Sequence, residues 1–173
     1  MTEIQRFTTE YMDVEDRIRL AGEVHASEPV VLWLTQRLLL RLLPHLLDWL
    51  EQQSSADVRG VLVQGFAQQA ALAHIKPQAP VSVRPIDTVW LVRAVDVTRS
   101  PDRLGLDFKL NPVAGSATAP ALQPQLNFSA HTLRQWLGII HQQYLRAQWP
   151  SHFWPDWLTE AQAARVEEKR VLH

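Results

Sequence analysis

Apolar residues change their spacing several times along the chain, and these changes predict the order of strands and helices. Between residues 4 and 20 they alternate with polar residues, which is typical of half-buried strands. Val30–Leu34 is an unbroken apolar run, typical of a strand covered on both faces. Turn-forming residues lie between these two patterns over Gly22–Pro29. The sequence therefore predicts a meander of three strands, over residues 4–11, 16–20 and 30–34.

A leucine-rich stretch follows, in which apolar residues recur at spacings of three and four, the period of a helix. Thr35 is placed to cap this helix, which is expected over residues 36–50, and Pro44 within it predicts a kink. Asp57 is the expected cap of a second helix over residues 58–74, so the two helices are expected to form a helical hairpin. The apolar side expected for the second helix carries Val58, Val61, Leu62, Gly65, Phe66 and Leu72.

Apolar positions on the first helix cover more than half of its circumference. One face of a sheet cannot cover so wide a sector, so we expect the second helix or a partner chain to cover the remainder. The positions that carry this expectation are Leu39, Leu43 and Leu47, which are candidate partner-binding residues.

The second half of the chain returns to the strand period. Two strands, from Val89 and over Leu104–Leu110, are expected to form a hairpin around the turn Ser100–Asp102. A small-residue loop over Asn111–Pro120 and a strand over Leu122–Phe128 follow. Ser129 is placed to cap a helix with an apolar stripe formed by Leu133, Trp136, Leu137, Ile140 and Tyr144.

These elements predict an α+β fold, namely an antiparallel β-sheet or sandwich with an inserted helical hairpin and a C-terminal helix. The length of 173 residues suits one domain, expected over residues 1–148. Residues 149–173 are expected to form a tryptophan-rich segment followed by a charged tail, Thr159–His173, which is consistent with a short solvated helix. Pro150 and Pro155 exclude one regular helix through this segment.

The tryptophan-rich segment has two interpretations. Its aromatic side chains either fold back to close a hydrophobic core, which is the commoner outcome, or form an exposed anchor for a partner protein, since tryptophan is frequent in binding hot spots. The candidate partner-binding residues are Trp149, Phe153, Trp154 and Trp157.

Composition restricts the chemistry. The chain has no cysteine, which excludes disulfides, thiolate catalysis and cysteine-ligated metals. Lysine and arginine total 17 against 18 acidic residues, so no overall charge draws the chain to nucleic acid or anionic membrane. Charged residues interrupt the leucine-rich stretch too often for a membrane span. Residues 1–20 show no secretion signal, so a cytoplasmic location is expected.

No catalytic motif stands in the sequence, so we expect no enzyme activity, cofactor or metal. Nucleophile-elbow, phosphate-loop and zinc-protease patterns are all absent. Asp13, Glu15 and Asp16 are interpreted as a solvated strand end rather than an acid–base cluster. His45 and His141, on otherwise apolar helices, are interpreted as satisfied interior or boundary histidines rather than ligands.

Four arginines could gather into a local basic surface. Arg37 and Arg41 are one turn apart on the first helix, and Arg17 and Arg19 lie on one face of a strand. Acidic residues lie close to them in sequence, so nucleic-acid binding is the alternative function rather than the first.

One family shares this order of elements. The stretches that carry the likeness are LWLT at Leu32–Thr35, TVWLVRAVDVT at Thr88–Thr98, LGLDFKL at Leu104–Leu110 and LNFSAHTLRQWLGII at Leu126–Ile140. With them, residues 4–148 resemble the globular head shared by the end-joining DNA-repair scaffold that supports a DNA ligase, its paralogues, and the centriolar cartwheel protein. The resemblance implies a non-enzymatic head. That family's dimerising coiled coil is not expected here, because Pro150 and Pro155 end the last helix.

A second likeness rests on a pattern of elements that occurs twice in the chain. Asp16–Leu50 and Arg103–Gln148 each run from strands through a Thr or Ser cap into a helix. This pattern is similar to the Whirly and Pur-type folds, whose sheets bind single-stranded nucleic acid.

The sequence as a whole predicts a non-catalytic protein-interaction or assembly module, an adaptor or subunit that pairs with a protein partner or with itself. The alternative is a single-stranded nucleic-acid-binding domain.

Overall fold

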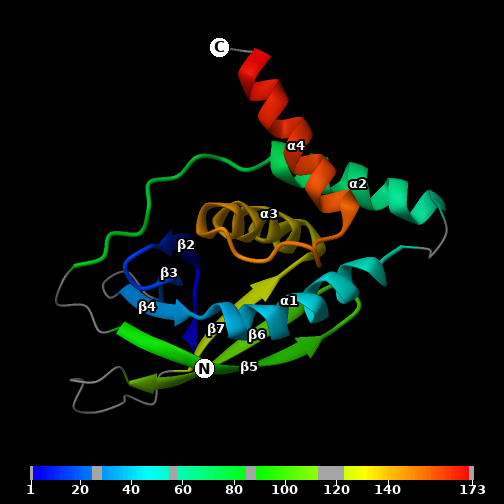
Figure 1. Cartoon of the computed structure of the whole chain (residues 1–173). Helices are drawn as coiled ribbons and strands as arrows, with labels where there is room; N and C mark the ends of the chain where they lie inside the picture. The colour runs from blue at the N-terminus through cyan, green and yellow to red at the C-terminus, as the bar shows by residue number, and fades with distance from the viewer. Residues whose placement is uncertain (1, 25–28, 55–57, 85–88, 113–122, 172–173) are drawn as a thin grey trace. The chain divides into compact units, whose positions relative to one another are not determined.

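The computed structural model describes residues 2–24, 29–54, 58–84, 89–112 and 123–171. Within this part the chain forms seven strands and four helices (Figure 1). The strands are β1 (Thr2–Glu3), β2 (Arg6–Met12), β3 (Arg17–Glu23), β4 (Pro29–Leu34), β5 (Val89–Arg99), β6 (Leu104–Pro112) and β7 (Pro124–Phe128). The helices are α1 (Gln36–Glu51), α2 (Val58–Ala73), α3 (Ala130–Ala147) and α4 (Asp156–Val171).

The strands form one mixed, strongly curled half-barrel sheet in the order β1-β7-β6-β5-β4-β3-β2. The meander β2–β3–β4 and the hairpin β5–β6 are antiparallel, which confirms the expected pairings. The expectation of an all-antiparallel sheet or sandwich was wrong, because β4 pairs with β5 in parallel, as β1 does with β7. The chain between β4 and β5 passes through α1 and α2, and such a long connection brings β5 in beside β4 in the same direction.

The N-terminal residues contribute to both edges of the sheet. Thr2 and Glu3 pair with β7, and three residues later the chain is already paired with β3 as β2. Between them, the Ile4 backbone N–H donates to Gln125 and that of Gln5 donates to Glu23. The N-terminal segment therefore pairs with β7 at one edge of the sheet and then continues as β2 at the other edge. Ile4, which is buried, fills the crossing.

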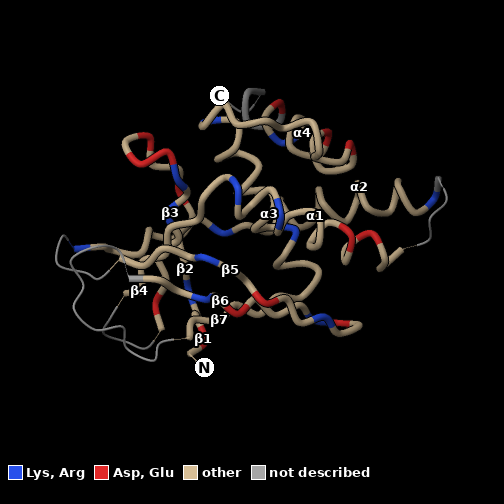
Figure 2. Tube along the Cα trace, turned by 60° about the horizontal axis from the view of Figure 1, so that its bottom comes forward, with Lys and Arg blue, Asp and Glu red and all other residues tan. Residues whose placement is uncertain are grey.

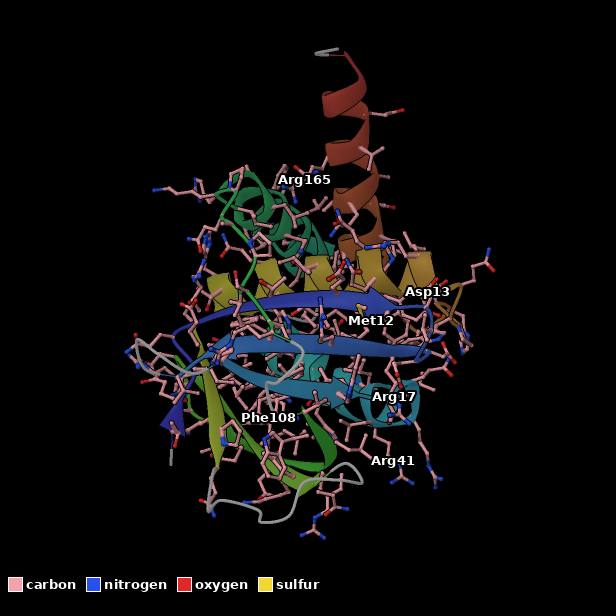
Figure 3. The ribbon with its side chains drawn as sticks, turned by 90° about the vertical axis from the view of Figure 1, so that its left-hand side faces the viewer. Met12, Asp13, Arg17, Arg41, Phe108 and Arg165 are labelled. Carbon is pink, nitrogen blue, oxygen red and sulfur yellow. The ribbon has the colours of Figure 1, made fainter. Side chains whose placement is uncertain are left out.

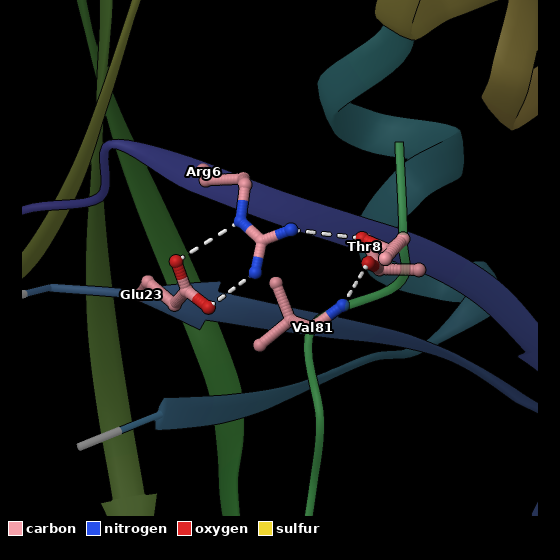
Figure 4. Close-up of polar contacts among 5 residues, drawn as sticks. Arg6, Thr8, Glu23 and Val81 are labelled. Carbon is pink, nitrogen blue, oxygen red and sulfur yellow. Dashed lines mark hydrogen bonds and ion pairs between the residues drawn. The ribbon is translucent and has the colours of Figure 1, made fainter. Parts of the chain in front are cut away.

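Residues 78–84 lie against β2 through side-chain hydrogen bonds (Figure 4). Arg6 pairs with Glu23 on β3 and donates to the Ala79 carbonyl at 2.8 Å. The Val81 N–H donates to the Thr8 hydroxyl at 2.8 Å. The hydrogen bond from Arg6 holds the pKa of Glu23 below its ordinary value. Because β2 is an edge strand, this cover leaves less of its edge open to unwanted pairing.

The helix boundaries follow the local signals. The Leu38 N–H donates to the Thr35 hydroxyl at the start of α1, and α1 continues through Pro44 to Glu51. Ser129 caps α3 in a reciprocal arrangement with Thr132, and the stripe expected on α3 is fully buried. The expected cap Asp57 lies outside the described residues. The interrupted C-terminal segment is confirmed, since α3 ends before Pro150 and α4 begins after Pro155.

The chain divides into two compact units, residues 1–44 with 78–127, and residues 45–77 with 128–173. The first unit holds most of the sheet, and the second holds α2, α3, α4 and the end of α1. Compactness does not test independent folding, so the expected boundary after residue 148 stays a prediction. Within the described part of the chain, no helix has both the length and the apolar composition needed to cross a membrane.

Candidate protein-interaction surface

The helix α2 packs on α3 and α4 within the second unit. Its principal neighbours are thus the two C-terminal helices, rather than α1 as the expected helical hairpin requires. Leu72 of α2 and Gln162 of α4 both lie close to Gly138 on α3. An added Cβ atom at Gly138 would lie 2.5 Å from the Leu72 side chain and 2.6 Å from the Gln162 side chain. Only glycine allows α2 and α4 to approach α3 so closely at this position.

The side of α2 that faces inward carries two polar side chains, Gln64 and Gln68, together with the buried Ala71 and Leu72. Gln64 and Gln68, one turn apart, are buried, and both make hydrogen bonds with Arg134 on α3. Gln64 accepts from the guanidinium through both its side-chain and its backbone oxygen. Its amide also donates to the Leu50 carbonyl at 2.7 Å, which ties α2 to the end of α1. Gln68 donates to the Arg134 carbonyl at 3.0 Å.

Arg134 is the centre of this polar contact. It is only 5% exposed, and burial lowers its pKa to about 10, so the side chain still carries its charge at neutral pH. The guanidinium lies 5.2 Å from the centre of the Trp157 ring, within cation–π range. Trp157 in turn donates to the Glu51 carboxylate at 3.2 Å. Gln64 is thus the side-chain acceptor that compensates a buried charge.

The opposite, outward side of α2 is apolar. Leu62, Val63 and Phe66 are 58%, 56% and 68% exposed, and Ala70 and Ala73 continue the same face at helical spacing. We call these five residues the α2 stripe. Arg59 is the only charged residue in α2, and the helix is drawn almost without charge in Figure 2. The α2 helix therefore buries two glutamines and exposes three large apolar side chains, which is unusual for a surface helix.

The polar contacts are strong enough to hold α2 in this orientation. Burying Leu62, Val63 and Phe66 instead would gain about 1.5–3 kcal/mol per side chain. Turning the helix would leave the Arg134 charge buried without its acceptor, at a cost of about 3–5 kcal/mol. Turning the helix would also expose the buried Leu72 side chain, at a further cost of about 1.5–3 kcal/mol. These costs match the possible gain, so the exposed stripe is a stable feature of the single chain.

The leucines expected at a partner interface are covered in the single chain. Leu39 and Leu43 have no exposed surface, and Leu47 is buried as well. The tryptophans behave similarly, because Trp149, Trp154 and Trp157 are buried and Phe153 is half-buried. Partner binding through any of these residues stays a prediction, and it would require the chain to open at these positions first.

The aromatic segment packs around Tyr144. The rings of Trp149, Phe153 and Trp154 each contact the Tyr144 ring edge-on. The His141 ring contacts the Trp154 ring in the same manner, with 5.1 Å between the two ring centres. Three polar atoms here lack a hydrogen-bond partner among the described residues, namely His141 Nδ1, Tyr144 Oη and Trp154 Nε1. The interpretation of His141 as a satisfied histidine was therefore wrong. Its burial lowers its pKa, which keeps the ring neutral.

The four candidate arginines divide into two pairs. Arg19 is paired with Glu10 at 3.0 Å and Arg17 approaches Glu15 at 4.0 Å. Arg37 and Arg41 are exposed on α1, with no ion pair to the described residues. Figure 3 shows Arg17 and Arg41 at the same end of the sheet, with Asp13 near them in that view. Acidic residues thus neutralise part of this surface.

The carboxylates between β2 and β3 form a turn. Asp13 accepts from the Val14 N–H at 2.9 Å, and Asp16 accepts from the Tyr11 hydroxyl at 3.0 Å with a left-handed backbone (φ 46°). These contacts shape the turn, which agrees with a solvated strand end. In the described part of the chain, no three metal-ligating side chains gather into a site.

The sequence placed Leu62, Phe66 and Leu72 on one apolar side of the second helix. The structure separates them, because Leu72 is buried whereas Leu62 and Phe66 are exposed. The available signal was Gln64 and Gln68, which lie one turn apart and face an arginine on another apolar helix.

Comparison with known proteins adds no relative. No protein-family model matches the chain, and no curated protein or solved structure matches it either. The function must therefore be argued from the geometry of this chain alone.

Proposed function

We propose that this chain is a non-catalytic protein-interaction module that binds another protein through the α2 stripe. The observation that carries the proposal is the orientation of α2, with Gln64 and Gln68 buried and Phe66 exposed. Exposed apolar side chains gathered on one face, without charge among them, are typical of the centre of protein interfaces. An aromatic residue in the middle of such a face is typical of a binding hot spot.

The resemblance to the non-enzymatic heads of the end-joining and cartwheel proteins is compatible with this proposal, and it stays a prediction. The proposed surface differs from the one expected from the sequence. It uses Leu62, Val63 and Phe66, which are already exposed, so binding needs no opening of the core.

Site-specific photo-crosslinking in living cells tests the proposal. A photoreactive phenylalanine analogue replaces Phe66, and irradiation is expected to yield a covalent adduct with another protein chain. The exposed side chain makes the replacement compatible with folding. The control places the same analogue at Val14, which is 88% exposed in the β2–β3 turn.

Adducts at position 66 that are absent at position 14 support the proposal. Equal adduct yields at the two positions, or none at position 66, contradict it. The mass of the adduct identifies whether the partner is a second copy of this chain or a different protein.

Single-stranded nucleic-acid binding is the second candidate, because Arg37 and Arg41 are exposed one turn apart. This function predicts retention on immobilised single strands that weakens with added salt. Replacing both arginines by glutamine would then reduce both the retention and its salt dependence. Salt-insensitive or absent retention contradicts this candidate without affecting the first.

A further inference from the structure

We propose that the partner of the α2 stripe is the α2 stripe of a second copy of this chain, arranged antiparallel about a two-fold axis at Phe66. The inference rests on the proposed function, since it names the occupant of the same surface. It is argued from the order of side chains along the stripe and from the charge at the start of α2.

Side chains along the stripe change from large to small, so the stripe is complementary to a second stripe that runs in the opposite direction. Leu62 and Val63 stand before Phe66, whereas Ala70 and Ala73 stand after it. Leu62 and Ala70 are each four residues from Phe66. In an antiparallel pair centred on Phe66, each Leu62 therefore faces the Ala70 of the other copy. Leu62 thus meets Ala70 at both ends of the pair, and Val63 faces Gln69, so this surface can match a second copy of itself, as an isologous interface requires.

A parallel pair would not have this property. It would place Leu62 on Leu62 at one end and Ala70 on Ala70 at the other, so the helices could not stay in contact along the whole stripe. The alanine end would lose contact, because two short side chains do not span the separation that two leucines impose.

Charge favours the same arrangement. Arg59 lies in the first turn of α2; that turn itself contains no acidic residue, and the last turn of the helix contains no basic residue. A cation is unfavourable at the start of its own helix and favourable at the end of another. Antiparallel pairing brings Arg59 beside Ala73 in the last turn of the other α2, where the carbonyl end of the helix attracts it. Parallel pairing would bring the two Arg59 side chains together.

The size of the surface predicts a reversible dimer. One helix face per copy buries less than the roughly 1,200–2,000 Å² of a standard stable interface. We therefore expect a mass that rises from one chain toward two as protein concentration increases, rather than a permanent dimer. Sedimentation velocity at several concentrations measures this equilibrium.

Single cysteines test the geometry, because the native chain has none and gives no background. Phe66→Cys is expected to form a disulfide-linked dimer on mild oxidation. Leu62→Cys alone and Ala70→Cys alone are not, because in the proposed pair each cysteine lies about 12 Å along the helix axis from its copy. An equal mixture of these two variants is expected to cross-link.

A cross-link by Leu62→Cys alone that is at least as strong as the cross-link in the mixture would overturn the antiparallel arrangement. Val14→Cys is the matched control at an exposed apolar position outside α2, and it is expected to remain uncross-linked.

Phe66→Glu supplies the complementary measurement. The side chain is exposed in the single chain, so circular dichroism and thermal unfolding are expected to match the native protein. The dissociation constant of the dimer should rise at least about 100-fold, because two carboxylates would be buried against each other. An unchanged dissociation constant would overturn the inference.

The two proposals fail in different ways. A single-chain mass at every concentration, together with an adduct to a different protein at position 66, overturns the dimer and retains the interaction module. A single-chain mass with no specific adduct at position 66 overturns both.

Discussion

Gly22 on β3 lies where the N-terminal strand crosses between the two edges of the sheet. A Cβ atom on this residue would lie 2.6 Å from Ile4 Cγ2 and 3.2 Å from its Cδ1. Ile4 is buried and has little room to withdraw. The absence of a side chain at Gly22 therefore lets Ile4 fill the crossing.

Gly22→Ala should lower the free energy of unfolding by about 1–3 kcal/mol, because it overpacks this contact. Gly65→Ala is the matched control, since an added Cβ atom in the middle of α2 meets nothing within 4 Å. That variant should be neutral or more stable by up to about 1 kcal/mol, because alanine favours helix. Urea denaturation measures both, and equal effects of the two substitutions would contradict the role assigned to Ile4.

At the scale of single residues, the sequence correctly predicted the features that depend on neighbouring residues. Ser129 caps α3 through contacts within three residues, and the stripe around Trp136 follows from spacing alone. The exposure of Phe66 could not be predicted in the same manner. It depends on Arg134, which is 70 residues from Gln64 in the sequence, and spacing within α2 contains no information about that partner.

At the scale of elements, the orientation of α2 depends on one polar contact with α3. Gln64→Leu should lower the free energy of unfolding by about 3–5 kcal/mol, because it leaves the Arg134 charge buried without its side-chain acceptor. Arg134→Met should cost less, about 1–3 kcal/mol, because it leaves only a neutral amide unpaired. The double variant should cost less than the two single effects together.

Gln69→Leu is the control for this series. It makes the same substitution on the exposed side of α2 and should change the free energy of unfolding by no more than about 0.5 kcal/mol. Additive effects of Gln64→Leu and Arg134→Met would show that the two side chains do not act together.

Most strands and helices were predictable as elements because they are long enough to show a period, whereas the two-residue β1 was not predicted. Which elements pack beside one another was less predictable from the sequence. The parallel pairing of β4 with β5 depends on how the chain returns after α2. The packing of α2 on α4 depends on a segment that the sequence predicted as a short helix but as a solvated one. Contacts between distant elements are decided by the whole chain rather than by local pattern.

For the molecule as a whole, His141 predicts how stability responds to pH. Burial lowers its pKa from the ordinary value of 6.5, so the unfolded chain takes up a proton at a higher pH than the folded chain. The stability from this group is complete above pH 6.5 and is lost as the pH falls below it toward the lowered folded-state pKa. The free energy of unfolding should therefore decrease between pH 7.5 and pH 5.5.

His141→Phe removes the titrating group and retains an aromatic ring beside Trp154. The variant should show a weaker decrease in the free energy of unfolding over the same pH range. Denaturant titrations at several pH values measure the difference, and parallel curves for the variant and the native protein would assign the pH dependence to other groups.

The pairing of β1 with β7 also affects how the protein is made. Thr2 is synthesised more than a hundred residues before its partner Pro124. The curled sheet can complete the pairing of β1 only after β7 has emerged from the ribosome. Contacts so distant in sequence slow folding. During synthesis the N-terminal strand can pair with β3 early, but its first residues must wait for β7.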